Sequence, residues 1–130
     1  MRNRGSVVIV ENNKVALIRR VREGLVYYVF PGGGIENGET PEEAAKREAF
    51  EELGVEVQVN ECIAEVEFNG TQFYFLSEII GGEFGTGQGE EYTDNERDRG
   101  TYLPVWVEFK ELSTIDVRPK EVAKIVQTLS

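Results

Sequence analysis

The sequence predicts a mixed α/β domain in which a β-sheet packs against two helices. Several runs rich in Val, Ile, Tyr and Phe are bounded by Gly, Pro, Asn or Asp, which is typical of strands. Two other segments, 41–53 and 119–129, carry helical signals. The 130 residues, of which 40% are hydrophobic, suffice for a single core. We therefore expect residues 1–130 to form one α/β domain.

The first part of the chain contains three expected strands. Ser6–Val10 and Lys14–Val21 are apolar and β-branched, and Glu11-Asn12-Asn13 between them predicts a hairpin. Leu25–Phe30 is the third strand, and Pro31 with the three glycines that follow ends it.

A helix is expected from about residue 41 to residue 53. Thr40-Pro41-Glu42-Glu43 combines an N-cap hydroxyl, a proline at the first helical position and a glutamate three residues after the cap. Gly54 supplies the stop. One stripe of this helix is apolar and is expected to be buried: Ala45, Ala49 and Leu53, with Phe50 at its edge.

A second stripe of the same helix is acidic. Glu48, Glu51 and Glu52 are related by i, i+3 and i+4, so their carboxylates lie together. Like charges at these spacings cost roughly 0.2–0.5 kcal/mol per pair, and the negative end of the helix dipole opposes them further. Arg47 offers only partial relief. The stripe is either a solvated acidic surface or the place where a cation binds.

The second part of the chain contains further strands and a closing helix. Asn69-Gly70 is a hairpin turn, and Pro104 indicates an edge or bulge position in the last strand. Cys62, the single cysteine, excludes an internal disulfide and is expected to be a buried thiol. The expected elements are strands at 55–59, 62–69, 72–80 and 102–107, a helical turn at 109–112, and a helix at 119–129 whose inner face carries Val122, Ile125, Val126 and Leu129.

Residues 81–101 interrupt this pattern with a segment rich in glycine. A structureless stretch of this length inside a domain is usually functional or disordered. Two interpretations stay open. The segment is a solvated loop, or it is a lid in which Glu90 or Glu91 supplies a late general base or an additional metal ligand.

Composition excludes several classes of function. The net charge of −10 argues against nucleic-acid polymers and anionic membranes as partners, and it is compatible with divalent cations. The chain has no histidine, so His-dependent triads, His-ligated zinc and imidazole acid–base chemistry are excluded. No signal peptide or long apolar span is visible, and we therefore expect a cytoplasmic protein.

Residues 33–55 resemble the Nudix signature, G-x5-E-x7-R-E-U-x-E-E-x-G-U, where U is an apolar residue. The match covers 23 of the 130 residues and fills every fixed place, with alanine in one apolar position. The matching residues are Gly33, Glu39, Arg47, Glu48, Ala49, Glu51, Glu52, Gly54 and Val55. The resemblance implies the Nudix-type α/β/α sandwich, a mixed β-sheet with the signature loop-helix-loop and a C-terminal helix.

The resemblance also implies an activity: metal-dependent hydrolysis of a nucleoside diphosphate linked to another group, by attack of water on phosphorus. Mg²⁺ or Mn²⁺ would be the cofactor, held by Glu48, Glu51 and Glu52, and hard oxygen ligands suit such ions. In similar proteins the carbonyl of the glycine before the signature can also bind metal, which here is Gly32. Arg47 would orient the glutamates, while Glu39, with Gly33 and Gly54, would support the signature loop and helix.

Two other classes of function stay open beside the hydrolase. A catalytically silent nucleotide-sensing module of the same fold would show degenerate signature carboxylates, and none is degenerate here. An isoprenoid diphosphate isomerase would need a catalytic cysteine and a longer chain, and Cys62 lies in an apolar strand.

The residues that choose the substrate lie outside the signature. Similar enzymes place a phosphate-contacting arginine on or after a strand, which makes Arg19, Arg20 and Arg22 candidates. A base-stacking aromatic is sought among five residues, although core packing is expected for most of them: Tyr27, Tyr28, Phe73, Phe75 and Trp106. The resemblance implies that the partner is a small nucleotide derivative such as a nucleoside triphosphate or ADP-ribose. Dimers are common among similar proteins, so a homodimer is one expected assembly.

Overall fold

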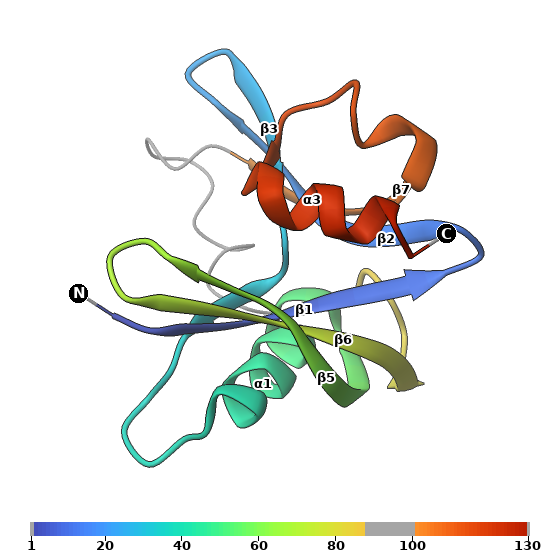
Figure 1. The fold of residues 1–130 in the computed structure, drawn as a ribbon. Helices are drawn as coiled ribbons and strands as arrows, with labels where there is room; N and C mark the ends of the chain where they lie inside the picture. Colours follow the sequence, from blue (N-terminus) through green and yellow to red (C-terminus); the bar gives the residue numbers. More distant parts are fainter. Residues whose placement is uncertain (1, 88–100, 130) are drawn as a thin grey trace.

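A computed structural model describes residues 2–87 and 101–129, whose strands form a curled mixed sheet with a helix on each side (Figure 1). The described elements follow the chain in this order: β1 (Arg4–Glu11), β2 (Lys14–Arg22), β3 (Leu25–Val29), β4 (Gly32–Gly34), α1 (Pro41–Leu53), β5 (Val55–Glu67), β6 (Thr71–Gly82), β7 (Thr101–Glu108), the 3-10 turn η1 (Phe109–Glu111), β8 (Val117–Arg118) and α3 (Lys120–Gln127).

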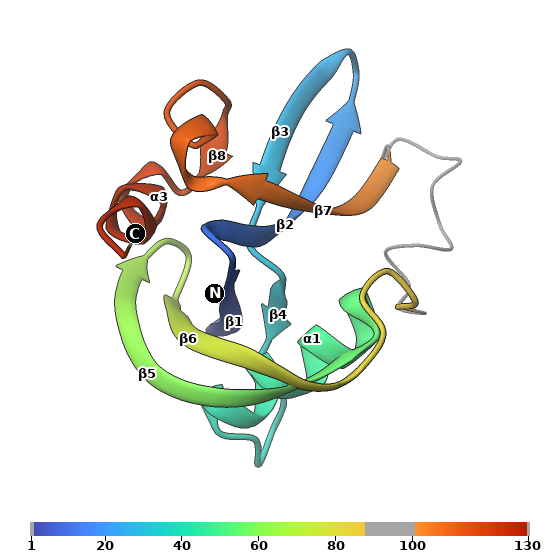
Figure 2. The same ribbon diagram turned by 90° about the vertical axis from the view of Figure 1, so that its right-hand side faces the viewer.

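Strand β1 belongs to two halves of the sheet. Its first six residues, 4–9, pair in parallel with β6, and the first three of these also pair with β4. Its last two residues, Val10 and Glu11, pair with the start of β2 across a tight turn. The order is β5-β6-β1-β2-β3-β8, with β7 added to β2. Figure 2 shows how the two halves diverge from β1, so that the sheet curls.

The two faces of the sheet carry separate hydrophobic cores. Neighbouring residues of β1 point to opposite faces, as the two-residue period of a strand requires. Val7 and Ile9 are buried with the α1 residues Ala45, Ala49 and Leu53. Val8 is buried with the α3 residues Val122, Ala123 and Val126. The expected α/β/α sandwich is therefore confirmed.

The turns form as the sequence predicts. Asn12 and Asn13 have φ of 50° and 62°, the left-handed conformation that a two-residue hairpin needs. Asn69 and Gly70 also have positive φ, between β5 and β6. Pro104 lies in β7, which pairs with β2 alone among the described strands. The expected edge position of Pro104 is confirmed.

Several expectations about the second half of the chain are wrong. The expected strands 55–59 and 62–69 are one continuous strand, β5, which ends at Glu67 and whose register with β6 shifts on both sides of Cys62. This irregular stretch leaves Cys62 exposed, contrary to the expected buried thiol. Leu129, expected on the inner face of the last helix, lies beyond α3 and is 40% exposed. The short strands β4 and β8 were not expected.

Helix α1 packs closely against the start of β1. A Cβ atom on Gly5 would collide with the carbonyl oxygen of Pro41 and would lie 3.1 Å from the backbone nitrogen of Ala45. The missing side chain at Gly5 therefore lets the first turns of α1 lie directly on the strand. Within the described residues, no helix is both long enough and apolar enough to cross a bilayer.

Candidate functional site

Helix α1 begins and ends as its caps dictate. The Thr40 hydroxyl accepts a hydrogen bond from the Glu43 N–H over 3.1 Å, and the Glu43 carboxylate accepts one from the Thr40 N–H over 2.9 Å. Gly54, at φ 80°, donates its N–H to the Phe50 carbonyl oxygen. No basic residue lies in the last turn. The backbone therefore fixes where Glu48, Glu51 and Glu52 emerge.

Arg47 organises the acidic stripe. Its guanidinium makes two hydrogen bonds to Glu39, of 2.7 Å and 3.0 Å. One nitrogen also contacts Glu48 at 2.8 Å and Glu51 at 3.3 Å, and the other donates to the Gly34 carbonyl oxygen at 3.0 Å. One side chain thus joins three carboxylates and the glycine-rich strand β4. The orienting role of Arg47 and the supporting role of Glu39 stay predictions, and these contacts are the geometry on which they rest.

The Arg47–Glu39 pair alters the acidity of both groups. Hydrogen bonds from the Arg47 side chain, and then from the Glu36 N–H, lower the pKa of Glu39 from 4.5 to about 2. Glu39, and then Glu48, raise the pKa of Arg47 far above its ordinary value. Both groups are therefore charged across the whole physiological range of pH.

The glycines of β4 lie against the two buried glutamates. Glu52 accepts a hydrogen bond from the Gly32 N–H over 2.7 Å, while the Gly32 carbonyl oxygen accepts one from Arg4 over 3.1 Å. A Cβ atom on Gly33 would collide with the carboxylate of Glu48. Glu48 and Glu52 are both less than a tenth exposed, whereas the side chain of Glu51 is 44% exposed. Gly33 is thus required for space, since any side chain there would displace Glu48.

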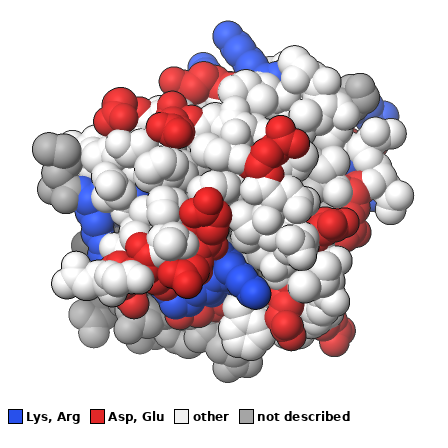
Figure 3. Space-filling view, turned by 60° about the horizontal axis from the view of Figure 1, so that its bottom comes forward, with Lys and Arg blue, Asp and Glu red and all other residues white. Residues whose placement is uncertain are grey.

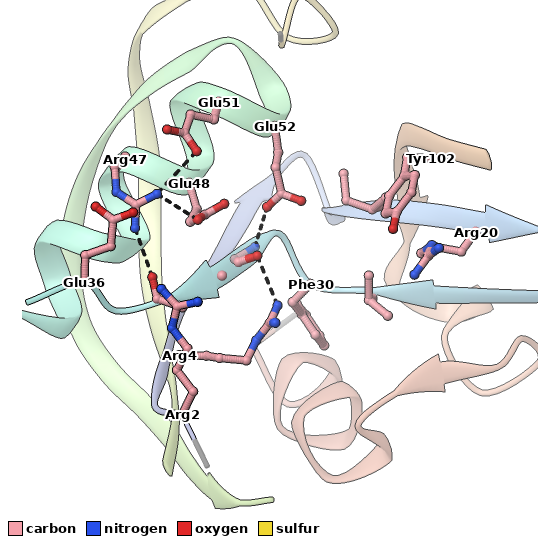
Figure 4. Close-up of a pocket in the computed structure, with 15 residues that line it drawn as sticks. Arg2, Arg4, Arg20, Phe30, Glu36, Arg47, Glu48, Glu51, Glu52 and Tyr102 are labelled. Atoms are coloured by element: carbon pink, nitrogen blue, oxygen red, sulfur yellow. Dashed lines mark hydrogen bonds and ion pairs between the residues drawn. The ribbon is translucent and has the colours of Figure 1, made fainter. Parts of the chain in front are cut away.

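A cavity of about 710 Å³ lies between α1 and residues of the strands β1, β2, β3, β4 and β7. Its wall includes Arg47 and the three glutamates of the acidic stripe. Figure 4 shows Glu48, Glu51 and Glu52 projecting from α1 toward one side of it, with Arg2 and Arg4 on another side and Arg20 and Tyr102 opposite. Its charged residues are four arginines and four glutamates: Arg2, Arg4, Arg20, Arg47, Glu36, Glu48, Glu51 and Glu52.

The balance of charge in this cavity differs from that of the whole chain. The chain carries a net charge of −10, whereas the cavity wall contains as many arginines as glutamates, four of each. Figure 3 turns the α1 side of the molecule toward the viewer and shows acidic side chains flanking a small basic cluster. All four cavity cations are arginines, whose planar guanidinium groups suit bidentate contacts with phosphate.

The donor set suits a hard divalent ion, since Glu48, Glu51 and Glu52 offer carboxylate oxygens only. In the part of the chain that the structure describes, no three acidic or cysteine side chains are arranged to enclose an ion. The reason lies in their contacts, because Glu48 and Glu51 turn to Arg47, and Glu52 turns to Gly32. Joint binding of one ion would require the three carboxylates to come closer together than they lie in this structure. Gly32 would also have to share its carbonyl oxygen with Arg4.

Of the three arginines proposed for phosphate, Arg20 alone is a cavity residue among those described. On β2 it pairs directly with Tyr27 of β3 and Tyr102 of β7. Its Cζ atom lies 3.8 Å from the centre of the Tyr102 ring and 5.7 Å from that of Tyr27. The two rings hold the guanidinium at the cavity wall through cation–π contacts. Arg19 and Arg22 do not reach this cavity.

Two further groups of candidates came from the sequence, the glutamates of the glycine-rich segment and the aromatic residues. Glu90 and Glu91 lie outside the described residues. None of the five aromatic residues considered from the sequence lines the cavity, whose aromatic wall is formed by Phe30 and Tyr102. Arg2, Arg4, Phe30 and Tyr102 were missed because they come from distant segments. The Phe30-Pro31 junction before the glycines was the one local signal that pointed to this place.

Comparison with known proteins gives a match over nearly the whole chain. The family model described as "NUDIX domain" matches residues 1–129. An 8-oxo-dGTP diphosphatase of Haemophilus influenzae is 40% identical over 68 residues, which cover 48% of this chain and 49% of the relative. An RNA pyrophosphohydrolase of Psychromonas ingrahamii is 44% identical over 48 residues, covering 37% of this chain and 26% of the relative. The chain thus spans between about a quarter and a half of these relatives.

The fold has counterparts among solved structures. A hydrolase of the NUDIX family from Clostridium perfringens superposes with a TM-score of 0.72 at 20% identity. That superposition covers 98% of this chain and 97% of the other. The similarity supports the architecture of the curled sheet and its two helices.

Proposed function

Because the chain belongs to the Nudix family, we propose that it is a divalent-metal-dependent pyrophosphohydrolase. Its substrate would be a nucleoside diphosphate linked to another group, and water would attack a phosphorus atom. The observation that carries the proposal is the position of Arg47, which joins the signature glutamates Glu39, Glu48 and Glu51 beside a cavity that also holds Glu52. Every acidic position of the signature is filled, which favours an enzyme over a catalytically silent sensing module.

Glu48, Glu51 and Glu52 would hold the cofactor, Mg²⁺ or Mn²⁺, and the Gly32 carbonyl oxygen is a further candidate ligand. When bound, such an ion neutralises charge on the diphosphate oxygens and lowers the pKa of water. The other residues bind and position. Arg20 would contact phosphate oxygens from β2, and Arg2 and Arg4 face the same cavity. Arg47 and Glu39 keep the glutamates in place.

The proton that leaves the attacking water needs an acceptor. With no histidine in the chain, a carboxylate is the available side-chain base near pH 7. Glu48, Glu51 and Glu52 line the cavity. Glu90 and Glu91, which are not among the described residues, remain candidates for the same role.

We further propose a cytoplasmic protein that acts on small nucleotide derivatives and assembles as a homodimer. The acidic net charge supports small substrates over long polyanions. Since one relative is named an RNA pyrophosphohydrolase, a 5′-triphosphorylated RNA oligonucleotide belongs in any substrate screen. Light scattering of the purified chain tests the dimer.

The test is a screen with Mg²⁺ of nucleoside triphosphates, ADP-ribose, dinucleoside polyphosphates, sugar nucleotides and a 5′-triphosphorylated RNA oligonucleotide, in which phosphate is detected after a coupled phosphatase. We expect turnover of at least one compound, its loss in excess EDTA, and its recovery with Mg²⁺ or Mn²⁺. Turnover that persists unchanged in excess chelator would contradict the proposed chemistry. Absence of any turnover, with nucleotide binding retained, would favour the sensing module.

A further inference from the structure

The free edge of β4 is occupied by side chains, because β4 pairs with β1 along its other edge. The Gly32 N–H donates to Glu52 over 2.7 Å, and the Gly32 carbonyl oxygen accepts from Arg4 over 3.1 Å. The Gly34 carbonyl oxygen accepts from Arg47 over 3.0 Å. Figure 4 marks these contacts with dashed lines. One carboxylate and two guanidinium groups thus take the place of a neighbouring strand.

The two arginines at this edge are held in different ways. Arg47 also binds three carboxylates of the signature. For Arg4, the bond to Gly32 is the one side-chain hydrogen bond found within residues 2–87 and 101–129, and the residue is exposed. An exposed group exchanges such a bond for water at little net cost. Arg4 is therefore the arginine that can leave the edge.

Arg4 and Glu52 approach Gly32 from opposite faces of the sheet. Along β1, Val7 belongs to the core under α1 and Val8 to the core under α3. The two-residue period of a strand therefore directs Arg4 to the α3 face, whereas Glu52 projects from α1. In antiparallel pairing the N–H and the carbonyl of one residue point to the same edge. The carboxylate and the guanidinium consequently meet at one edge of β4.

An ion held by Glu52 would compete with Arg4 at this point. The Gly32 carbonyl oxygen is a candidate ligand of that ion, and it is the atom that Arg4 occupies. If both cations stayed, a divalent ion would lie beside a guanidinium group. Repulsion between like charges is strong where a site is shielded from water, and Glu52 is buried. Entry of the ion therefore favours the departure of Arg4.

A place for the displaced guanidinium exists beside the first cavity. A second cavity, of about 560 Å³, shares the wall residues Arg4, Val29 and Phe30 with the first. Its wall also contains Glu67 and Glu121. Arg4 can thus turn from the first cavity to the second and remain near negative charge.

We propose that Arg4 is a built-in substitute for the metal ion: it occupies the Gly32 carbonyl oxygen in the metal-free protein, and a divalent ion displaces it toward Glu67 and Glu121. The proposal rests on the metal site of the proposed hydrolase and adds to it a residue outside the signature. While bound, Arg4 stabilises the free edge of β4. It also lowers the affinity for the ion, because its hydrogen bond must break before Gly32 binds metal.

Binding of Mn²⁺ without substrate tests this competition. Free Mn²⁺ is measured by electron paramagnetic resonance during titration of the wild type and of Arg4→Met, which keeps a long unbranched side chain without charge or donors. We expect Arg4→Met to bind Mn²⁺ roughly tenfold more tightly, the scale of one hydrogen bond that no longer has to break. In EDTA, calorimetry should give Arg4→Met a lower melting temperature, because the edge of β4 has lost a partner.

Arg2→Met is the matched control. Arg2 lines the same cavity and carries the same charge, but within the described part of the chain its side chain gives no hydrogen bond to Gly32. Arg2→Met should tighten Mn²⁺ binding by roughly twofold or less, because it changes only the screened charge of the cavity. Arg4→Lys keeps the charge but replaces the planar fork with a single ammonium group. Its affinity for Mn²⁺ should lie between those of the wild type and Arg4→Met.

NMR of the wild type follows the displacement directly. Protein labelled with ¹⁵N and ¹³C is titrated with Mg²⁺, which is diamagnetic, while the Arg4 side-chain N–H and the Gly32 carbonyl carbon are observed. Both signals should shift together and saturate at the same Mg²⁺ concentration, whereas the Arg2 side-chain signal should move little. This titration needs no variant, so it decides the matter even if a substitution impairs folding.

The outcomes separate this inference from the hydrolase. A greater gain in Mn²⁺ affinity for Arg4→Met than for Arg2→Met supports displacement even if the protein hydrolyses nothing. Equal affinities of the wild type and Arg4→Met, or equal gains in the two variants, overturn it even if the protein is an active hydrolase. An Arg4 signal that stays fixed while the Gly32 carbonyl signal saturates overturns it as well. Absence of Mn²⁺ binding at millimolar concentration, in both the wild type and Arg4→Met, has the same consequence.

Discussion

Single residues of α1 contribute either to the stability of the helix or to the proposed chemistry of the cavity, and these two kinds of residue lie at opposite ends of α1. Thr40 caps the first turn and is not a residue of the cavity wall, whereas Glu52 is buried at the last turn and accepts a hydrogen bond from the Gly32 N–H. Glu52 is held near Glu48 and against the helix dipole, which costs stability in the absence of a cation. Stability and activity should therefore respond differently at the two positions.

The change Glu52→Gln keeps an oxygen that can accept the Gly32 hydrogen bond and removes one negative charge. We expect the metal-free variant to melt at or above the wild-type temperature, while kcat falls by roughly two orders of magnitude because a proposed metal ligand is lost. Thr40→Ala is the control, and it should destabilise by about 1 kcal/mol while sparing kcat. Calorimetry in EDTA and initial rates with Mg²⁺ measure both. If Glu52→Gln unfolds the metal-free protein and leaves the rate intact, the acidic stripe is structural.

Glu39 provides a prediction on acid stability. Its pKa is lowered from 4.5 to about 2, mainly by the Arg47 side chain, so its charged form is favoured in the folded protein. The stabilisation is complete above the unfolded pKa and is lost as the pH falls through the folded one. The difference in free energy of unfolding between wild type and Glu39→Gln should therefore shrink between pH 4.5 and pH 2. Urea unfolding at pH 6 and pH 3 measures it, and an equal difference at both would refute the pairing.

At the scale of elements, the position of α1 depends on the glycines that it touches. Gly5 of β1 lets the first turns approach, and Gly33 of β4 leaves space for Glu48 near the last. At both ends of α1, the absence of a side chain on a glycine therefore lets the helix lie close to the sheet. A side chain at either position would shift the glutamates relative to the cavity, even where the hydrophobic stripe of α1 still packs.

The change Gly5→Ala tests this contact at the end of α1 remote from Glu52. Its new methyl group would meet the carbonyl oxygen of Pro41, so we expect a loss of roughly 1–3 kcal/mol in stability, the usual cost of overpacking. Gly81→Ala on β6 is the control, because its Cβ would find the nearest atom, an oxygen of Glu56, at an ordinary 3.5 Å. Chemical unfolding of both variants measures the difference. Equal stabilities would show that α1 moves freely on the sheet.

The helices, turns and strands also show which features can be predicted from residues that are close in sequence. The capping box, the Asn12-Asn13 turn and the edge position of Pro104 were predicted correctly, because each depends on residues close in sequence. The break expected between 59 and 62 is wrong, because pairing with β6 carries β5 through that stretch with shifts of register. Strand β4 escaped prediction, since three glycines have weak strand propensity and pairing with β1 alone makes them a strand.

The same limit applies to the site. The glutamates and Arg47 were predicted because the signature places them on one helix within a few residues. Arg4, Phe30 and Tyr102 reach the cavity from β1, the end of β3 and β7, and only the folded sheet brings them together. Because successive side chains of β2 point to opposite faces of the sheet, Arg19 and Arg20 lie on different faces. The sequence does not indicate which of these faces carries the cavity.

For the whole molecule, the net charge of −10 and the buried glutamates make ion binding a source of stability. An ion that binds only the folded state adds about 2.7 kcal/mol at a hundred times its dissociation constant. Mg²⁺ should therefore raise the melting temperature of the wild type in buffer of fixed ionic strength. The rise should be much smaller for Glu52→Gln. Equal shifts in both proteins would mean that Mg²⁺ acts by screening the acidic surface.

The division of β1 between two halves of the sheet has a consequence for how the chain is made. Val10 and Glu11 find their partners in β2 within a few residues, but residues 4–9 pair with β6, nearly seventy positions later. On the ribosome, the start of the nascent chain must therefore wait with that edge uncovered until β6 has emerged from the exit tunnel. The glycine and serine at positions 5 and 6 make this unpaired edge less prone to aggregation than the valines that follow. Synthesis stalled just before residue 71 should leave the edge unpaired and accessible to chaperones.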